Sequence, residues 1–326
     1  MPSQQTDFLL DKILLNRYKI VSKIGAGSFG QIYSAVDSHV TDDCSGGTPT
    51  DASCSNLRKL KRDYAVKFEK IEPKEKHIQL KKEYEILVEL RAIDGVPRVY
   101  AYNILNEQYY FMVMQLLGYS LEGLFDRCNR KFTVKCTLLI ADQVFIRLHE
   151  IHSRGYIHRD MKPDNLVIGR GDESWKVYLI DFGLAKEFMD RKTKFHNEYN
   201  ERKNMTGTAR YASINNHLGM EQSRRDDIEG FVYIMLYFLK GQLPWQGLKT
   251  DARKERYERI AEKKLATPVT VLCAGLPIEF QMLVSYSRNL QFRDVPDYKY
   301  CRLLIHVLAR HSGISFDWRY DWVRNK

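Results

Sequence analysis

The chain carries the stretch His158-Arg159-Asp160-Met161-Lys162-Pro163-Asp164-Asn165, and Asp181-Phe182-Gly183 follows it after a short interval. Asp160 is suited to accept the proton of a hydroxyl group as its oxygen attacks phosphorus, and Lys162 is suited to reach the phosphoryl group. Asn165 and Asp181 offer oxygen ligands, which Mg²⁺ prefers. The alternative is a polar loop with an isolated acid, but the second acid lies inside an apolar, strand-like run. The pattern predicts a phosphate-transfer site.

Length and composition bound the class of protein. The 326 residues are enough for two folding units or one two-lobed unit, and 44% hydrophobic residues can form a sizeable core. The net charge of +10 favours acidic or phosphorylated partners, while nucleic acid, anionic lipid and solubility alone stay open.

Cysteine usage and apolar runs indicate the compartment. The six cysteines are scattered without a CxxC pair, and the first residues lack the basic and apolar regions of a signal peptide. The longest apolar run, Phe231–Leu239, is far shorter than the ~18 residues that span a bilayer. We expect a reducing, cytoplasmic setting with free thiols. The basic, helical stretch Asp251–Lys264 leaves nuclear targeting and plain solvation open.

A glycine-rich turn lies near the start of the chain. Strand-like Tyr18–Gly25 enters Gly25-Ala26-Gly27-Ser28-Phe29-Gly30, and alternating Gln31–Val36 leaves it. The pattern predicts a hairpin whose backbone N–H groups are free to face phosphates. Such a turn alone is a weak signal, and an ordinary turn is the alternative.

A lysine and a glutamate form the next expected pair. Lys67 lies in the strand-like run Asp63–Glu69, and apolar residues recur at helical spacing through Ile78–Ile93. Glu83 falls on that apolar stripe, whereas Glu85 is about 200° further round the helix. We expect Glu83 to meet Lys67 and to hold it against the α- and β-phosphates of a nucleotide. A surface glutamate on a charged helix is the alternative.

Composition also suggests where the chain divides. The segment Ser38–Arg62 is polar and then basic, which indicates a loop inserted between two strands. Two strands, Val99–Leu105 and Tyr109–Met114, precede a hinge at Gln115–Gly118, after which the pattern becomes helical. The expected parts are an N-terminal extension at 1–16, a first lobe at 17–116 containing the 38–62 insertion, a second lobe at 117–322 and a short end at 323–326.

Taken in order, these motifs resemble those of eukaryotic protein kinases. The segments Thr206–Asn215 (TGTARYASIN), Glu221–Asp227 (EQSRRDD) and Leu243–Leu248 (LPWQGL) narrow the resemblance to the casein kinase I family. The similarity runs from about Asn16 to Trp322, apart from the insertion. Three positions depart from the family pattern, namely Gln115, Tyr119 and Val232.

The resemblance implies an α+β, bilobal kinase fold, with a small β-rich N-lobe carrying one main helix and a larger, mainly helical C-lobe. It implies ATP and Mg²⁺ as cofactors, Asp160, Lys162, Lys67 and Glu83 as catalytic residues, and Asn165 and Asp181 as metal ligands. Asp227 would hydrogen-bond the backbone near His158, with a simple helix N-terminal acid as the alternative. The implied nucleotide-binding residues are Ile24, Gly25, Ala26, Gly27, Ser28, Phe29, Gly30, Ile32, Ala65, Lys67, Met114, Gln115, Leu117, Leu166 and Ile180.

Two basic clusters match positions of the same family. Arg210 and Arg256 match residues that bind an acidic or phosphorylated substrate side chain, which suits the bidentate guanidinium group. Arg159, Lys186 and Lys203 match a second anion site. The resemblance also implies activity without phosphorylation of the activation segment. Solvated surface charges are the alternative for both clusters.

The predicted function is a monomeric Ser/Thr protein kinase that acts on acidic or phosphate-primed proteins, with no stable nucleic-acid or membrane partner. A pseudokinase scaffold is the first alternative, although Lys67, Asp160 and Asp181 are all intact. A charge-driven binder of anionic surfaces is the second.

Overall fold

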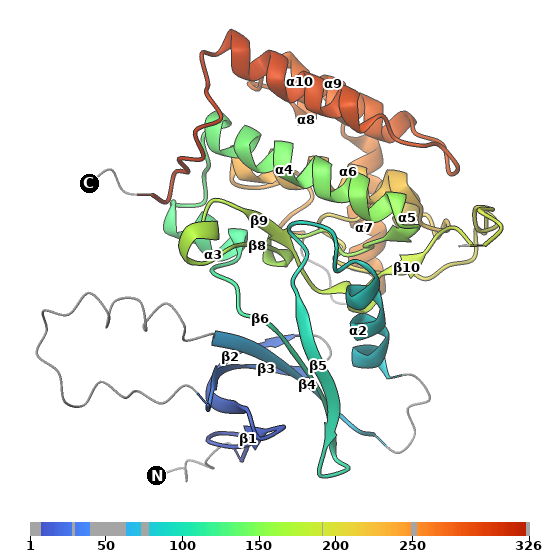
Figure 1. Cartoon of the computed structure of the whole chain (residues 1–326). Helices are drawn as coiled ribbons and strands as arrows, with labels where there is room; N and C mark the ends of the chain where they lie inside the picture. The colour runs from blue at the N-terminus through green and yellow to red at the C-terminus, as the bar shows by residue number, and fades with distance from the viewer. Residues whose placement is uncertain are drawn as a thin grey trace, which may run out of the picture. The chain divides into compact units, whose positions relative to one another are not determined.

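The structure is a computed structural model that describes residues 8–27, 30–39, 63–72, 78–190, 192–248 and 253–323. The chain divides into two units (Figure 1). The N-terminal unit comprises Met1–Arg91 and Pro97–Leu117, and the C-terminal unit comprises Ala92–Val96 and Gly118–Lys326.

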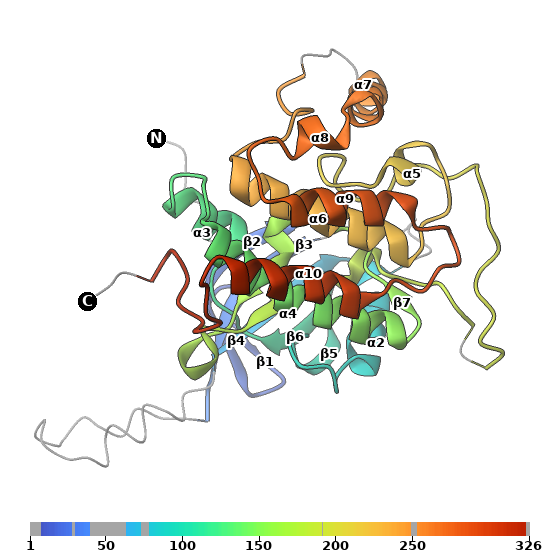
Figure 2. The same ribbon diagram turned by 90° about the horizontal axis from the view of Figure 1, so that it is seen from above.

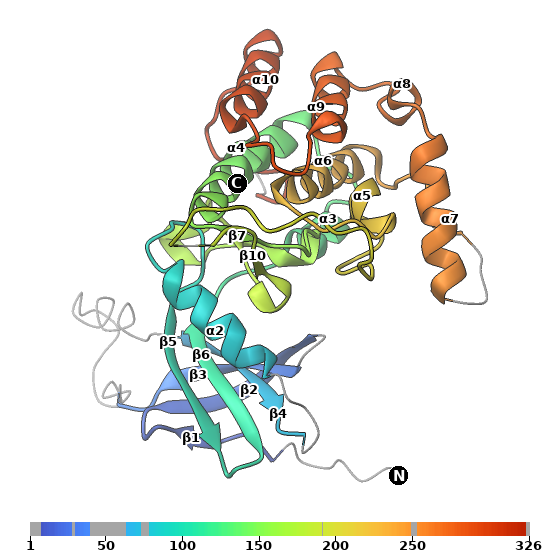
Figure 3. The ribbon, with the colours of Figure 1, turned by 90° about the vertical axis from the view of Figure 1, so that its right-hand side faces the viewer.

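The N-terminal unit is built on one six-stranded antiparallel sheet in the order β1-β2-β3-β4-β6-β5. The helix α2 packs against β4, β5 and β6 (Figure 3). The elements are β1 (Ile13–Leu14), β2 (Tyr18–Gly27), β3 (Gly30–Asp37), β4 (Asp63–Lys70), α2 (Gln79–Glu89), β5 (Val99–Leu105) and β6 (Tyr109–Gln115).

The core of this unit includes part of the segment that the sequence predicted as an N-terminal extension at 1–16. Leu9 and Leu14 are buried in the same cluster as Tyr33, Val66 and other strand residues, and Leu14 lies in β1, which pairs with β2 at the sheet edge. The predicted insertion lies outside the described residues from position 40 to 62. The predicted helix over Ile78–Ile93 is shorter than expected, since α2 ends at Glu89.

The C-terminal unit is mainly helical (Figure 2). It also contains two short two-stranded sheets. One sheet pairs β7 (Tyr156–Ile157) with β10 (Lys186–Glu187), and the other pairs β8 (Leu166–Ile168) with β9 (Val177–Leu179). The helices are α3 (Leu121–Arg127), α4 (Val134–Ser153), α5 (Ile214–His217), α6 (Arg224–Lys240), α7 (Arg253–Ala266), α8 (Val269–Leu272), α9 (Ile278–Asn289) and α10 (Tyr298–His311).

Helix α6 forms the centre of this unit. It packs against α4 and α9, and nearly all of its residues are buried, as expected for a helix that is apolar almost all round. It begins at Arg224, directly after Ser223, whose backbone N–H donates to the carboxylate of Asp226 in the first turn at 2.7 Å. The helix ends at Lys240, and Gly241 follows it in the left-handed conformation with φ 83°.

The predicted α+β fold, with a small β-rich part and a larger helical part, is confirmed. None of the helices in the described ranges is long and apolar enough to cross a membrane. Four cysteines in those ranges, Cys128, Cys136, Cys273 and Cys301, are free thiols.

Candidate active site

Lys67 and Glu83 form a buried ion pair inside the N-terminal unit. Lys67 lies at the middle of β4, where its register partners are Ile32 on β3 and Met112 on β6. Its Nζ is 2.7 Å from Oε2 of Glu83 on α2, and the two residues are only 5% and 2% exposed. Glu85 is exposed and lies 4.0 Å from Lys81. The helical spacing therefore predicted the correct partner for the lysine.

The glycine-rich turn is a hairpin, as predicted. Strands β2 and β3 pair up to Gly27 and Gly30, and Ser28 and Phe29 lie outside the described residues. A Cβ atom at Gly30 would lie 1.8 Å from the backbone oxygen of Phe68, whereas one at Gly25 would meet nothing within 4 Å. Glycine at position 30 is thus required by the close approach of β4, and glycine at position 25 leaves open space beside the backbone.

The other nucleotide-binding residues predicted for the N-terminal unit lie along the same strands. Ile24 on β2 is half exposed although it is large and apolar, and Ala65 on β4 pairs with Met114 on β6. The remaining predicted members of this set are Ala26, Ile32, Gln115 and Leu117, of which only Ala26 is exposed. The backbone N–H of Gln115 donates a hydrogen bond to the backbone oxygen of Arg98 at 2.8 Å.

Three neighbours fix the carboxylate of Asp160 in the C-terminal unit. Oδ1 accepts a hydrogen bond from Oγ1 of Thr208 at 2.7 Å, and Oδ2 accepts one from Nζ of Lys162 at 2.6 Å. The Nδ2 atom of Asn165 donates to the backbone oxygen of Asp160 at 2.9 Å and lies 3.3 Å from Oδ2. Asp160 is only 5% exposed, so this geometry is held in a largely dry setting. Sequence analysis predicted no role for Thr208.

Asp227 holds the backbone of the same loop, as the resemblance implied. Its carboxylate accepts hydrogen bonds from the backbone N–H groups of His158 and Arg159, at 2.7 and 2.8 Å. Arg159 adopts φ 67°, a left-handed conformation that costs about 1–3 kcal/mol for a non-glycine residue. Burial alone would raise the pKa of Asp227, but hydrogen bonds from the His152 side chain and the His158 backbone outweigh burial, so the pKa lies below its usual value.

Asn165 and Asp181 belong to one hydrogen-bonded framework. The Ile180 N–H donates to the Asn165 backbone oxygen at 2.9 Å, and Nε2 of His158 lies 2.9 Å from the Ile180 oxygen. Asp181 follows directly and adopts the left-handed conformation with φ 64°. Leu166, the other apolar residue predicted to contact nucleotide, is fully buried beside Asn165.

The oxygen donors of this framework fit a divalent cation. The amide nitrogen of Asn165 is engaged by Asp160, which directs its side-chain oxygen away from that bond. Among the described residues, no group of three or more His, Cys, Asp or Glu side chains could hold a metal ion by itself. Two oxygen ligands without a protein cage are what Mg²⁺ uses when phosphates and waters complete its shell.

The residues of the predicted second anion site converge on one acid. Glu221 is 5% exposed, and its two carboxylate oxygens lie 2.8 Å from Nζ of Lys186 and 3.2 Å from Nζ of Lys203. Burial raises the pKa of Glu221, but the two lysines outweigh burial and lower it. The positive charge of Arg159 also interacts with the Glu221 carboxylate. Nε of Arg159 donates a hydrogen bond to the Leu184 oxygen at 2.7 Å. The sequence did not identify Glu221 as their counter-ion.

Arg210 and Arg256 lie on different elements of the C-terminal unit. Arg210 is half-buried, and its guanidinium lies 3.3 Å from the Tyr211 hydroxyl and over the ring of Tyr237. Arg256 is exposed on α7.

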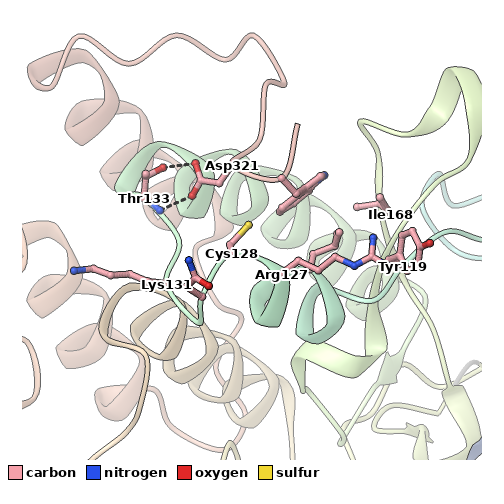
Figure 4. A pocket seen from close by; sticks show the side chains of 10 residues that line it. Tyr119, Arg127, Cys128, Lys131, Thr133, Ile168 and Asp321 are labelled. Carbon is pink, nitrogen blue, oxygen red and sulfur yellow. Dashed lines mark hydrogen bonds between the residues drawn. The ribbon is translucent and has the colours of Figure 1, made fainter. Parts of the chain in front are cut away.

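A separate cavity of about 1,050 Å³ lies beside α3 and the start of α4 (Figure 4). Arg127 stacks on the ring of Tyr119 at 3.8 Å, and Asp321 accepts hydrogen bonds from the backbone and hydroxyl of Thr133. None of the predicted site residues lines this cavity. The lining residues are Tyr119, Leu124, Arg127, Cys128, Asn129, Lys131, Thr133, Ile168, Asp321 and Trp322.

Comparison with known families agrees with the geometry. The model of the protein kinase domain matches residues 47–289, which is more than half of the chain. The match includes Lys67, Glu83, the 158–165 stretch and Asp181, and it begins after the glycine-rich turn. Members of this family generally use ATP and a divalent metal to phosphorylate proteins. The chain belongs to the protein kinase domain family.

Proposed function

We propose that this chain is a serine/threonine protein kinase of the casein kinase I type, which transfers the γ-phosphoryl group of Mg-ATP to acidic or phosphate-primed proteins. The observation that carries the proposal is the Asp160 carboxylate. Hydrogen bonds from Thr208 and Lys162 orient it at 2.7 and 2.6 Å, as a proton acceptor for a substrate hydroxyl must be oriented.

Each group has a distinct part in this mechanism. Asp160 accepts the proton of the attacking hydroxyl, and Lys162, whose Nζ already contacts Asp160, neutralises charge on the transferring phosphoryl group. Lys67, fixed by Glu83, holds the α- and β-phosphates. Asn165 and Asp181 would hold Mg²⁺, which supplies charge neutralisation between the phosphates. Catalysis then comes mainly from positioning and electrostatic stabilisation.

The second basic cluster supports activity without phosphorylation of the activation segment. Many kinases order this segment by adding a phosphate that pairs with basic residues. Here Lys186 and Lys203 already have the Glu221 carboxylate as a counter-charge at 2.8 and 3.2 Å. The activation segment can therefore be ordered, as we propose, without a covalently added phosphate.

The preference for acidic or primed substrates rests on Arg210 and Arg256. Burial lowers the pKa of Arg210, but the Tyr211 hydroxyl and the nearby Tyr237 and Glu122 outweigh this effect, so the guanidinium stays charged. A charged, planar donor at the edge of the segment that holds Thr208 suits a phosphate or carboxylate on the substrate. We propose a cytoplasmic monomer, in keeping with the sequence-based expectation.

The alternatives are less well supported. A pseudokinase scaffold has no need for an intact Lys67–Glu83 pair or for an oriented Asp160, and both are present. A binder of anionic surfaces would require only charge, and salt-sensitive binding that survives loss of ATP binding would favour it.

The decisive experiment replaces the proposed proton acceptor. Asp160→Asn is expected to lower kcat by about 10²–10⁴ in a Mg²⁺-dependent peptide assay. Asp164→Asn is the matched control, because Asp164 is an exposed acid in the same stretch, and kcat should change little. Equal activity of the Asp160→Asn variant and the unmodified chain would reject a kinase mechanism through Asp160.

Substrate preference is tested with primed, acidic and neutral Ser/Thr peptides. Charge reversal at Arg210 and Arg256 should weaken use of primed peptides far more than of unprimed ones. Lys263→Glu is the control, since Lys263 is an exposed cation on the same helix as Arg256. Equal losses on primed and unprimed peptides would reject the proposed anion site and leave the kinase activity untouched.

A further inference from the structure

Helix α7 carries a lysine whose charged end is completely buried. Lys264 is 0% exposed, although it lies in a helix that is otherwise rich in solvent-facing charges. Figure 3 shows α7 at the edge of the C-terminal unit, where it packs against α5. A buried ammonium group is costly unless its N–H groups are bonded and its charge is compensated. The burial of the Lys264 ammonium group therefore requires specific partners around it.

Two backbone carbonyl groups accept hydrogen bonds from the Lys264 ammonium group, and a histidine lies beside it. Nζ lies 2.9 Å from the Ala209 oxygen and 2.5 Å from the Ala212 oxygen. Nε2 of His217 lies 3.2 Å from Nζ and also 3.1 Å from the Ala209 oxygen. Burial and then the charge of Lys264 lower the pKa of His217 to about 4, so the imidazole beside the ammonium group is neutral.

Two aromatic rings, one from α6 and one from the loop after it, and charged groups on α6 and α9 complete the surroundings. The ammonium lies 5.2 Å from the ring centre of Tyr233 and 5.1 Å from that of Trp245, which favours a cation. Burial lowers the pKa of Lys264 to about 7, whereas the carboxylate of Glu229 opposes this shift and Arg288 adds to it. The geometry thus holds a cation at a considerable desolvation cost.

The carbonyl groups that Lys264 binds belong to the segment next to Asp160. Ala209 and Ala212 flank Arg210, and Thr208 donates to the Asp160 carboxylate. Trp245 donates from Nε1 to the Arg210 oxygen at 2.7 Å. The carbonyl groups of residues 209, 210 and 212 therefore all accept hydrogen bonds from side chains outside the segment. Lys264 donates to two of them.

We propose that Lys264 is a positioning residue for protein substrate: it fixes residues 208–212, and with them Arg210, relative to α7, which carries Arg256. The inference rests on the proposed kinase function and adds to it the device that holds the peptide-binding segment. Arg256 is eight residues from Lys264, roughly two helical turns or about 12 Å along the axis. The same helix therefore presents one proposed substrate contact and anchors the segment that presents the other.

The kinetic test uses Lys264→Met, which keeps most of the length of the side chain and removes its charge and donors. We expect the KM for a peptide substrate to rise about tenfold or more, because hydrogen bonds from a charged group are lost, and the KM for ATP to stay within about twofold. Lys263→Met is the matched control, since it removes an exposed charge from the adjacent position. Unchanged KM for peptide in a folded Lys264→Met variant overturns the proposal, and so does an equal rise in both KM values.

A second readout does not depend on activity. Residues 208–212 contain a tryptic site after Arg210, which is half-buried in the folded chain. Lys264→Met should speed cleavage after Arg210 by about tenfold relative to Lys263→Met, as local opening of the segment becomes easier. Unchanged cleavage overturns the proposal. A chain that shows this acceleration but phosphorylates no peptide refutes the proposed function and leaves the positioning role standing.

Folding of the variant is the remaining control. Should Lys264→Met fail to fold, Lys264→Gln replaces it, because an amide suits the surrounding carbonyl groups while it removes the charge. The same rise in the KM for peptide and the same faster cleavage are expected. Failure of both variants to fold assigns Lys264 to the stability of the whole unit and rejects a selective role in substrate binding.

Discussion

The carboxylate of Asp227 accepts a hydrogen bond from the backbone N–H of Arg159 at 2.8 Å, at a residue whose φ is 67°. The other carboxylate oxygen accepts from the His158 N–H at 2.7 Å. One side chain of the buried helix α6 therefore compensates a strained conformation next to Asp160. A simple helix N-terminal acid would need neither bond.

Asp227→Asn tests this role. The amide keeps one acceptor oxygen and places an NH₂ group against a backbone N–H, so one buried donor loses its partner. We expect the free energy of unfolding to fall by about 2–3 kcal/mol, whereas loss of a helix-dipole interaction would cost about 0.3–1 kcal/mol. Because the loop carries Asp160, kcat should also fall by about 10²-fold. Urea denaturation and peptide kinetics measure the two effects.

The Lys67–Glu83 pair gives a second prediction. Glu83→Gln removes the negative charge 2.7 Å from Nζ of Lys67 in a buried setting, which costs about 3–5 kcal/mol when one partner of such a pair is lost. We expect a lower melting temperature and a higher KM for ATP. Glu85→Gln on the opposite face of α2 serves as the control, since its exposed pairing with Lys81 contributes about 0–1 kcal/mol. Similar losses for both variants would contradict the assignment.

These two pairs show what sequence could and could not predict. Glu83 could be predicted because the α-helix has a fixed period. Its spacing from the apolar residues of the same helix places Glu83, and not Glu85, on the inward face. Asp227 was found only through the resemblance, since no local pattern links it to Arg159. Glu221 was missed because its contacts with Lys186 and Lys203 join segments distant in sequence.

Lys264 shows the same limit more sharply. The basic composition of Asp251–Lys264 suggested solvation or nuclear targeting, but the side chain of Lys264 is wholly buried. The one available signal is its position four residues after buried Ile260 and three before buried Thr267, on the inward stripe of α7. A lysine on such a stripe is expected to turn its ammonium group toward solvent. The acceptors that hold it inside are backbone oxygens of residues 209 and 212, which are distant in sequence, so no local pattern predicts them.

The hydroxyl of Thr208 gives a third prediction. Thr208→Val keeps the shape of the side chain and removes the donor to Oδ1 of Asp160, which is 2.7 Å away. We expect kcat for peptide phosphorylation to fall by about 10–100-fold, because the proton acceptor loses part of its orientation, while the KM for ATP stays unchanged. Thr208→Ser restores the hydroxyl and should restore most of kcat. A serine variant as impaired as the valine variant would argue that the methyl group matters and the hydrogen bond does not.

The pH dependence of stability gives the last prediction, which concerns His152. This residue is fully buried, with Nδ1 2.6 Å from the Tyr298 hydroxyl and Nε2 2.9 Å from Oδ2 of Asp227. A neutral imidazole satisfies both partners, and burial lowers its pKa below 6.5 despite the opposing effect of Asp227.

The unfolded chain therefore binds more protons than the folded chain as pH falls through 6.5, and the free energy of unfolding must fall with it. Asp226 works in the opposite direction, since burial raises its pKa to about 7 and the folded state gains stability as pH falls below that value. His152→Gln can keep both contacts without titrating, so the difference between the two chains isolates the histidine. Urea denaturation between about pH 7.5 and 5.5 should show a steeper loss of stability in the unmodified chain. Parallel pH profiles for the two chains would mean that His152 is not held neutral by the fold.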